Sequence, residues 1–478
     1  MTTTALVGGT ALADLGAGPE LVGDVTVVLE DDQIAHLGGS WTGTPDRTID
    51  THGRLLLPGL VNLHAHAGHG AHHHLVDGAG EPDLLGATYL TAKAPAPGSS
   101  SPGSDPDLLA EWTVWELLRT GTTTVLEAGC PPPLARALVR AADRVGLRVH
   151  VGVAMASGRW IAEGEGIAWE DGEDAASQLA LAEGFLDEIG TSGLTKGAVA
   201  VAQVDTASDD LLAGAAKLAT ARGVPLTIHA AQNRREVLVT LEQHAVTPLE
   251  RLHRAGALAP GTVLAHAVFA DHHPAVCSGH RELALLAESG AAVAHCPVHL
   301  SRRGDAMHSF DRYVDAGVVV GLGTDTSPRD LLAEARAAAT IARTLDGGAA
   351  GATARIVGAI TTESARALGR PELGRLAVGG PADLVVVDER RPSYGVVSDP
   401  VRAAVECATG DDVEHVFVAG RHVVRGGTVI GLDGAELRHR VQTDAEALWA
   451  TAGSWHRRGL DFERLNPPPF PPRPQERS

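Results

Sequence analysis

The sequence is short of cysteine, of long apolar runs and of aromatic side chains, and each shortage excludes a class of protein. Its four cysteines are scattered and form no CxxC pair, which argues against a disulfide framework or a cysteine zinc knuckle and for a reducing compartment. No run of eighteen apolar residues is present, and the first residues lack the basic end and cleavage pattern of a signal peptide. We therefore expect a cytoplasmic protein that has no membrane partner.

Basic side chains are scarce as well. The 39 lysines and arginines stand against 59 acidic residues, which gives a net charge of -20. A chain with this charge repels phosphate backbones, so nucleic acid is not expected as a partner. Aromatic residues make up 3% of the chain, which disfavours a pocket that stacks a flat ring. Trp160 and Trp169 remain as exceptions, whereas Trp112 and Trp115, three residues apart in a predicted helix, are expected to pack.

The order of sequence patterns along the chain indicates an α/β protein. With 478 residues, of which 44% are hydrophobic, the chain is long enough for a barrel and a smaller domain. The first fifty residues and two late stretches, 374–388 and 412–427, alternate β-branched and polar residues, as short antiparallel strands do. Between them, short apolar runs are followed repeatedly by helical stretches rich in alanine and leucine. This repetition is typical of parallel βα units.

Eight β-type runs can be counted in the central region, and eight parallel strands close a barrel. They cover residues 55–66, 122–129, 148–155, 198–204, 225–231, 262–268, 291–298 and 318–325. We therefore predict a (β/α)8 TIM-like barrel. In such a barrel the catalytic groups come from the C-terminal ends of different strands.

Imidazoles and one carboxylate stand at those strand ends. They are His64 and His66 in the first strand, His229 in the fifth, His266 in the sixth, His295 in the seventh and Asp325 in the eighth. Residues two apart on a strand point to the same side, so His64 and His66 can bind one ion together. A third imidazole from His229 and the carboxylate of Asp325 complete a metal site that leaves room for a water.

The motifs LLLPGLVNLHAH, PLTIHAAQ, VLAHAV, AHCP and GLGTDTS, in this order, resemble the metal-dependent amidohydrolase superfamily. The pattern is closest to the branch of atrazine chlorohydrolase, guanine deaminase and cytosine deaminase. The flanks IDTHGRLLLPG, GRLAVGGPADLVVVD and VEHVFVAGRHVVRGG resemble the β-sandwich that this family builds from both chain ends. The resemblance implies a composite β-sandwich of residues 1–54 and 374–435 around a hydrolase barrel of residues 55–373. We further expect a helical segment at 436–464 and a proline-rich disordered tail at 465–478.

The resemblance also implies roles for the residues at the strand ends. His64, His66, His229 and Asp325 would hold one ion per chain, usually zinc and in some relatives iron. His266 matches the strand-six histidine that contacts the attacking water, and Asp325 doubles as the proton acceptor, so these two are the predicted catalytic residues. His295, in the HCP motif, either lines the substrate pocket or packs.

Gln232 departs from the family pattern. Ring deaminases of this branch usually carry a glutamate at this place, three residues after the strand-five histidine, where it shuttles a proton to the heterocycle. Glutamine cannot transfer that proton. Either Glu236 or Asp325 compensates, or the substrate is of another kind, which Gln232 would contact. Our leading hypothesis is hydrolysis of an amide, urea, carbamate or similar non-peptide carbon–nitrogen bond in a small molecule through a metal-activated hydroxide.

Two alternatives stay open. The first is deamination or dechlorination of a heteroaromatic ring of the purine, pyrimidine or triazine type. The second is a non-catalytic assembly protein on the same scaffold, which the intact ligand set disfavours, because a scaffold has no reason to keep four metal ligands. A homo-oligomer is an expectation from the family alone.

Two further positions bear on the site. Relatives often read Ser-Asn shortly after the strand-seven proline, where this chain reads CPVHLSRRG, so His299 is a candidate substrate contact of its own. Two-metal members of the superfamily bridge their ions with a carboxylated lysine at the end of strand four. Lys196 precedes a β-type run and is therefore placed at the start of that strand, which favours a single ion.

The tract NLHAHAGHGAHHH adds four histidines after the metal pair. His69, His72, His73 and His74 follow in a glycine-rich loop that is predicted to cross the barrel mouth, where loops shape substrate pockets. Three roles are open for them: substrate or lid contact, with His72 and His73 as the candidates, an accessory metal site, or a solvated tract.

Overall fold

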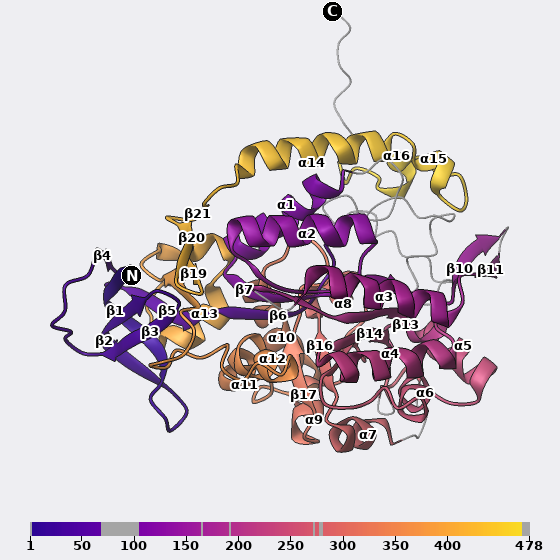
Figure 1. The fold of residues 1–478 in the computed structure, drawn as a ribbon, viewed down its shortest axis with the longest axis horizontal. Helices are drawn as coiled ribbons and strands as arrows, with labels where there is room; N and C mark the ends of the chain where they lie inside the picture. Colours follow the sequence, from indigo (N-terminus) through magenta and orange to yellow (C-terminus); the bar gives the residue numbers. More distant parts are fainter. Residues whose placement is uncertain are drawn as a thin grey trace, which may run out of the picture.

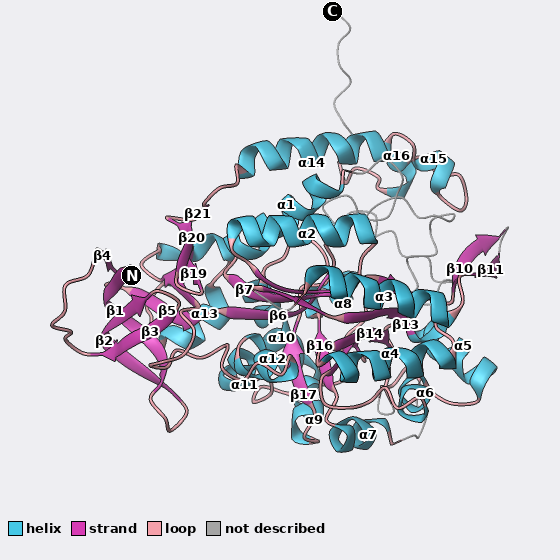
Figure 2. Ribbon diagram, viewed as in Figure 1, coloured by secondary structure: helices cyan, strands magenta, loops and turns pink. Residues whose placement is uncertain are grey.

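The computed structural model describes residues 2–67, 105–163, 166–190, 193–270, 273–276 and 281–470, which form a mixed α/β fold (Figure 2). Four histidines of the predicted loop, His69, His72, His73 and His74, lie outside these residues. No helix in the described part of the chain combines the length and the hydrophobicity that crossing a membrane requires.

Both ends of the chain build one nine-stranded sheet. Its order is β21-β20-β19-β18-β5-β1-β2-β3, and β4 pairs with β1. The strands are β1 (Thr3–Asp14), β2 (Pro19–Glu30), β3 (Gln33–Gly38), β4 (Arg47–Asp50), β5 (Arg54–Pro58), β18 (Leu384–Asp388), β19 (Val413–Val418), β20 (Arg421–Arg425) and β21 (Thr428–Val429). Strand β18 joins the two chain ends because it pairs antiparallel with both β5 and β19. Apolar side chains of this sheet, among them Leu6, Val27 and Phe417, form a core cluster of their own.

The central region forms two parallel sheets. Their orders are β12-β8-β7-β6 and β17-β16-β15-β14-β13-β9. The strands are β6 (Leu60–Ala65), β7 (Thr122–Glu127), β8 (Arg148–Val151), β9 (Ala154–Met155), β12 (Thr195–Gly197), β13 (Val199–Gln203), β14 (Leu226–Ala230), β15 (Thr262–His266), β16 (Ala292–His295) and β17 (Val319–Leu322). The third predicted strand, 148–155, is interrupted, and its halves β8 and β9 belong to different sheets. The fourth, 198–204, contains β13, while β12 directly precedes it and belongs to the other sheet. A strand is thus present in each of the eight predicted segments.

The first predicted strand, 55–66, is in fact two strands. Strand β5 pairs with β1 and β18 in the nine-stranded sheet, whereas β6 pairs with β7. Gly59 lies between them, where a Cβ atom would approach Thr123 Oγ1 to 2.3 Å, so a larger residue does not fit. The dipeptide Pro58-Gly59 is a turn signal at this break, but both flanking strands are buried, so the sequence on either side reads as one apolar run.

The last parallel strand segment lies against the first. Ala65 and Asp325 form a parallel bridge. The amide of Asp325 donates to the carbonyl of His64 (3.0 Å), and the amide of His66 donates to the carbonyl of Asp325 (2.7 Å). Gly323 allows this approach, since a Cβ atom there would lie 2.7 Å from the Cβ of His64. Main-chain hydrogen bonds therefore hold Asp325 beside the other two predicted metal ligands of this pair of segments, His64 and His66.

Helices connect these strands (Figure 1). They are α1 (Pro106–Arg119), α2 (Pro132–Val145), α3 (Ala175–Ile189), α4 (Asp209–Arg222), α5 (Arg234–His244), α6 (Pro248–Arg254), α7 (Glu282–Ser289), α8 (Pro297–Arg302), α9 (Phe310–Asp315), α10 (Leu331–Asp346), α11 (Thr353–Ile360), α12 (Thr362–Ala367) and α13 (Pro400–Cys407). Helix α4 shows the local reasons. Ser208 caps its first turn by accepting a hydrogen bond from the amide of Leu211, Gly223 ends it with a φ of +64°, and Ala215 and Ala219 are buried.

The C-terminal helices α14 (Gly434–Trp449), α15 (Ala452–Trp455) and α16 (Phe462–Leu465) occupy the predicted helical segment. Leu437 and Val441 of α14 pack on Trp112 and Trp115 of α1, whose rings are stacked with centroids 5.1 Å apart. The predicted packing role of these two tryptophans is confirmed.

Trp160 and Trp169 lie on a hairpin of β10 (Gly158–Glu163) and β11 (Gly166–Asp171). Helix α16 ends at Leu465, the first residue of the predicted tail. Residues 471–478 of that tail lie outside the described part of the chain.

Candidate metal centre and active site

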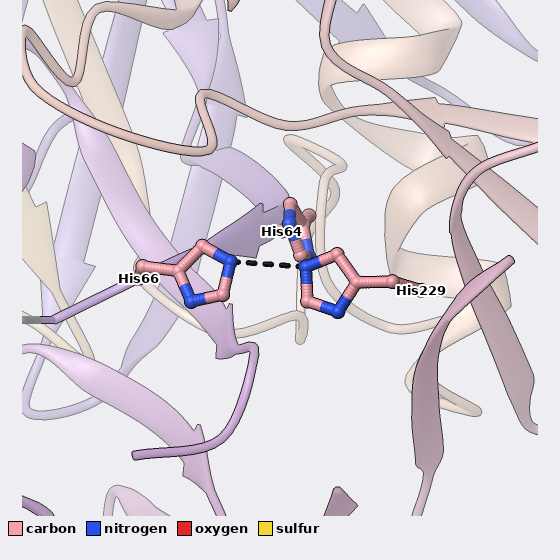
Figure 3. Close-up of side chains that lie close together, drawn as sticks. All are labelled: His64, His66 and His229. Carbon is pink, nitrogen blue, oxygen red and sulfur yellow. Dashed lines mark hydrogen bonds between the residues drawn. The ribbon is translucent and has the colours of Figure 1, made fainter. Parts of the chain in front are cut away.

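Three histidines from two strands lie together near the carboxyl ends of the parallel strands. His64 belongs to β6, His66 follows directly after it, and His229 belongs to β14. One ring nitrogen of each lies within 4.8 Å of the others, and Figure 3 shows the three side chains grouped around one point. His64 and His229 are buried and His66 is partly buried. The structure thus brings together the imidazoles that the sequence predicted as ligands.

The orientation of His229 suits a metal ligand. Its Nδ1 lies 2.5 Å from the carbonyl oxygen of Ala202, so this nitrogen carries the proton and donates it. The Nε2 lone pair then points toward Nε2 of His66, 3.0 Å away. Burial lowers the pKa of His229 to about 4, which keeps the ring neutral at pH 7. Two imidazole nitrogens at this separation fit a shared ion, because ligand atoms of a tetrahedral zinc site lie roughly 3.3 Å apart.

Asp325 adds a carboxylate to the group. Its Oδ1 lies 3.9 Å from Nε2 of His64 and 3.7 Å from Nε2 of His66, and its Oδ2 lies 3.4 Å from Nε2 of His266. His64, His266 and Asp325 form a second set of ligand atoms within 4.8 Å of one another. Imidazole nitrogens and a carboxylate oxygen are donors that zinc prefers, so the residues present fit one divalent ion.

The main chain at this centre adopts unusual conformations. The φ angles of His266, Ala267 and Asp325 are +75°, +43° and +60°, a region that residues with a side chain rarely adopt. Each such residue costs about 1–3 kcal/mol and persists only where its surroundings hold it in place. The hydroxyl of Tyr313 donates to the carbonyl of Ala267 at 2.5 Å and so supports one of these residues.

His299 lies at this centre as well. Its Nε2 is 3.3 Å from Oδ2 of Asp325, and its ring stacks on that of His266 with centroids 5.9 Å apart. Two imidazoles therefore approach the same carboxylate oxygen. His295 is buried, its ring centroid lies 6.3 Å from that of Phe310, and burial lowers its pKa to about 3. Whether either residue contacts a substrate stays a prediction.

Gln232 is buried beside the centre, and its neighbour is a second amide. Its Oε1 accepts a hydrogen bond from Nε2 of Gln203, the last residue of β13, at 3.1 Å. Glu236, the first compensating group that the sequence offered, is fully buried. Its two oxygens accept from the main-chain amides of Ala231 (2.7 Å) and Gln232 (2.8 Å), so this carboxyl holds the chain after β14. Burial and the nearby charge of Asp205 raise its pKa well above the usual range.

Lys196 lies in β12, opposite His150 of β8. Gln203 lies seven positions after Lys196, roughly 23 Å along the strand direction, and Gln203 is the residue that pairs with His229. Lys196 therefore lies at the start of the fourth strand segment, as the sequence indicated.

A cleft of about 1300 Å³ lies elsewhere in the molecule. It is lined by residues of β1, β2 and the helices α9 to α13, by Val318 directly before β17 and by Val320 within that strand. The histidines of the metal centre do not line it. We therefore assign the candidate active site from its metal-binding side chains and not from this cleft.

The model of the amidohydrolase family matches residues 55–423. The chain belongs to this family. Two curated relatives are 5-methylthioadenosine/S-adenosylhomocysteine deaminases. The one from Natronomonas pharaonis is 30% identical over 95% of this chain and 99% of its own length, and the one from Halobacterium salinarum is 32% identical over 90% and 95%. The predicted enzyme class, a hydrolase of carbon–nitrogen bonds other than peptide bonds, is thereby confirmed.

Solved structures show the same fold. An adenosine deaminase from Xanthomonas campestris with bound zinc has a TM-score of 0.79 at 22% identity and covers 94% of this chain and 98% of its own. Atrazine chlorohydrolase from Arthrobacter aurescens, complexed with zinc, has a TM-score of 0.75 at 23% identity and covers 93% and 99%.

Sequence reasoning missed Gln203 and Tyr313. Gln203 could have been found, because it ends the predicted fourth strand and the rule of strand ends applies to it. Tyr313 could not, since nothing in the sequence shows that a tyrosine of α9 contacts the residue after His266.

Proposed function

We propose that this amidohydrolase uses one divalent ion, zinc, held by His64, His66, His229 and Asp325, to hydrolyse a non-peptide carbon–nitrogen bond. The convergence of three imidazoles and one carboxylate carries the proposal. Zinc in two solved structures of the same fold supports the choice of metal, and iron is the alternative. When bound, such an ion supplies Lewis-acid activation of the attacking water.

The proposal includes a closed (β/α)8 barrel of residues 55–373 beside a composite β-sandwich of residues 1–54 and 374–435. The support for the barrel is the order of the two parallel sheets, the continuity of β8 with β9 and of β12 with β13, and the bridge between Ala65 and Asp325. The sandwich rests on the nine-stranded sheet that both chain ends share. The cytoplasmic location and a homo-oligomeric state stay predictions.

Two residues are assigned to proton transfer. Asp325 accepts a proton from the attacking water and passes it to His266, whose Nε2 lies 3.4 Å from Oδ2 of Asp325. His266 in turn donates this proton to the nitrogen of the carbon–nitrogen bond that breaks. Burial holds the pKa of His266 well below its usual range, so a proton that reaches this ring is readily released.

Gln232 determines the kind of substrate in this proposal. Because its Oε1 accepts from Gln203, its Nε2 is the group left to face a substrate, and an amide Nε2 donates hydrogen bonds but transfers no proton. The site therefore suits a substrate that offers a hydrogen-bond acceptor, such as the carbonyl of an amide, urea or carbamate.

Deamination of an adenosine-type nucleoside is the second candidate. The names of the relatives favour it, and a 5'-deoxyadenosine deaminase from Methanothermobacter thermautotrophicus, 28% identical over 86% of this chain, adds to them. In this case a group other than residue 232 must protonate the ring.

The first experiment is elemental analysis of the purified enzyme, paired with ammonia release from amides, ureas, carbamates and aminopurine nucleosides. One zinc per chain and turnover of the acyclic compounds support the leading proposal. One zinc with turnover of the nucleosides alone selects the second candidate, and a purified protein that holds and binds no metal refutes both.

A further inference from the structure

Arg329 lies four residues after Asp325, and its side chain is fully buried. A buried guanidinium is costly unless its charge is paired and its N–H groups are hydrogen-bonded. The hydrogen-bond partners of Arg329 therefore indicate its structural role.

The guanidinium of Arg329 bridges two partners that are distant in sequence. Its Nη1 donates to Oε2 of Glu116 on α1, and its Nη2 donates to the main-chain carbonyl of His66. The second oxygen of Glu116 accepts from the hydroxyl of Ser327 at 2.5 Å. Ser327 and Arg329 both belong to the loop that follows Asp325. Their hydrogen bonds therefore connect this loop to Glu116 and to the main chain of His66.

Other side chains hold the same end of β6. The amide of Ala67 donates to Oε1 of Glu127 at 3.3 Å, and the carbonyl of Ala67 accepts from Thr113 at 2.9 Å. The hydroxyl of Thr120 donates to the main-chain carbonyl of Arg329 at 2.5 Å. The residues directly after the metal pair are thus held by α1, by β7 and by the loop after β17.

We propose that Arg329 is a positioning residue for the metal centre. It ties the main chain of His66 to the loop that begins at Asp325, and so maintains the separation of these two ligands, whose Nε2 and Oδ1 atoms lie 3.7 Å apart. The planar fork of arginine reaches both partners at once, whereas lysine offers one compact charge. This inference rests on the proposed zinc site.

The test compares Arg329→Lys with Arg148→Lys as the matched control. Arg148 is also buried and also pairs with a carboxylate, that of Asp383, at 3.1 Å, but it lies at the opposite end of its strand, the start of β8. Zinc affinity is measured by competition with a chromophoric chelator, and the thermal midpoint of the metal-free protein is measured beside it.

We expect Arg329→Lys to bind zinc about 10- to 100-fold more weakly, as is usual when a group that orients a metal ligand is lost. Arg148→Lys should lower the thermal midpoint and leave zinc affinity at the wild-type value. Glu116→Gln, which removes the charge that faces Arg329, should weaken zinc binding in the same direction, and it decides the matter if Arg329→Lys does not fold.

Three results overturn the inference. The first is a folded Arg329→Lys with wild-type zinc affinity. The second is an equal loss of zinc affinity in Arg329→Lys and Arg148→Lys, which would reflect stability alone. The third is a wild-type protein that binds no zinc, which refutes the proposed function and this inference with it.

Discussion

The side-chain amide of Gln203 donates a hydrogen bond to that of Gln232 across 3.1 Å, at the ends of two neighbouring strands. Ring deaminases of the branch usually have a glutamate at the position of Gln232. In the proposed function the Nε2 of Gln232 therefore offers the substrate a hydrogen-bond donor where those enzymes have a proton carrier.

Gln232→Glu should therefore change the substrate. We expect deamination of an aminopurine or aminotriazine to rise about 100-fold or more, because general acid catalysis contributes about 10² to 10⁴. Turnover of acyclic carbonyl substrates should fall, since the donor to the carbonyl is lost. Ammonia release from both classes measures the change.

Gln442→Glu is the control for that variant. Gln442 lies on α14 and hydrogen-bonds Glu446 at the surface, so its charge change should leave both activities unaltered. Loss of every activity in a correctly folded Gln232→Glu would contradict the substrate argument.

Variants of His66 and His266 should affect different properties, metal binding in the first case and proton transfer in the second. His66→Gln removes a ligand, so we expect zinc content to fall well below one per chain. His266→Gln should keep zinc, because His64, His66, His229 and Asp325 remain, while kcat falls about 10²- to 10⁴-fold. Elemental analysis and kcat on the same preparations decide this, and loss of zinc from both variants would make His266 a ligand.

The residues of the candidate metal centre could be predicted from the sequence, whereas surrounding side chains such as Arg329 could not, and the reason is physical. Ligands at strand ends are brought together by the sheet itself, so the position of His229 in its strand suffices to place it near His64. Arg329 has no position in a strand that would predict its neighbours. Its partner Glu116 is 213 residues away, and only the packed structure shows that the two side chains meet and are buried. The break at Gly59 does carry a signal, the dipeptide Pro58-Gly59, but burial of both flanking strands removes the polar/apolar alternation that would show them as two strands.

Tyr313 offers a test of the strained main chain. Tyr313→Phe keeps the ring and removes the hydroxyl that donates to the carbonyl of Ala267, the residue after His266. The lost hydrogen bond is worth about 1 kcal/mol, and a loosened His266 should lower kcat by about tenfold with KM and zinc content nearly unchanged. Tyr394→Phe is the control, because Tyr394 is also buried but lies outside the metal centre, in a 3₁₀ turn before α13. Equal effects of the two variants on kcat would refute a specific role.

His150 should make the protein sensitive to mild acid. Burial lowers its pKa from 6.5 to about 4, and the charges of Arg370, Arg148 and Lys196 act in the same direction. Between these two values the unfolded chain binds a proton that the folded protein does not, so the free energy of unfolding falls as the pH drops from about 6.5 toward 4. This residue alone accounts for a loss of about 2 kcal/mol between pH 7 and pH 5. Denaturant unfolding of the metal-free protein at pH 7 and at pH 5 measures this effect. Between these pH values the free energy of unfolding should fall less in His150→Gln than in the wild type. The control is His439→Gln, on the exposed side of α14, which should lose as much as the wild type does. An unchanged pH dependence in His150→Gln would mean that this histidine accepts a proton inside the fold.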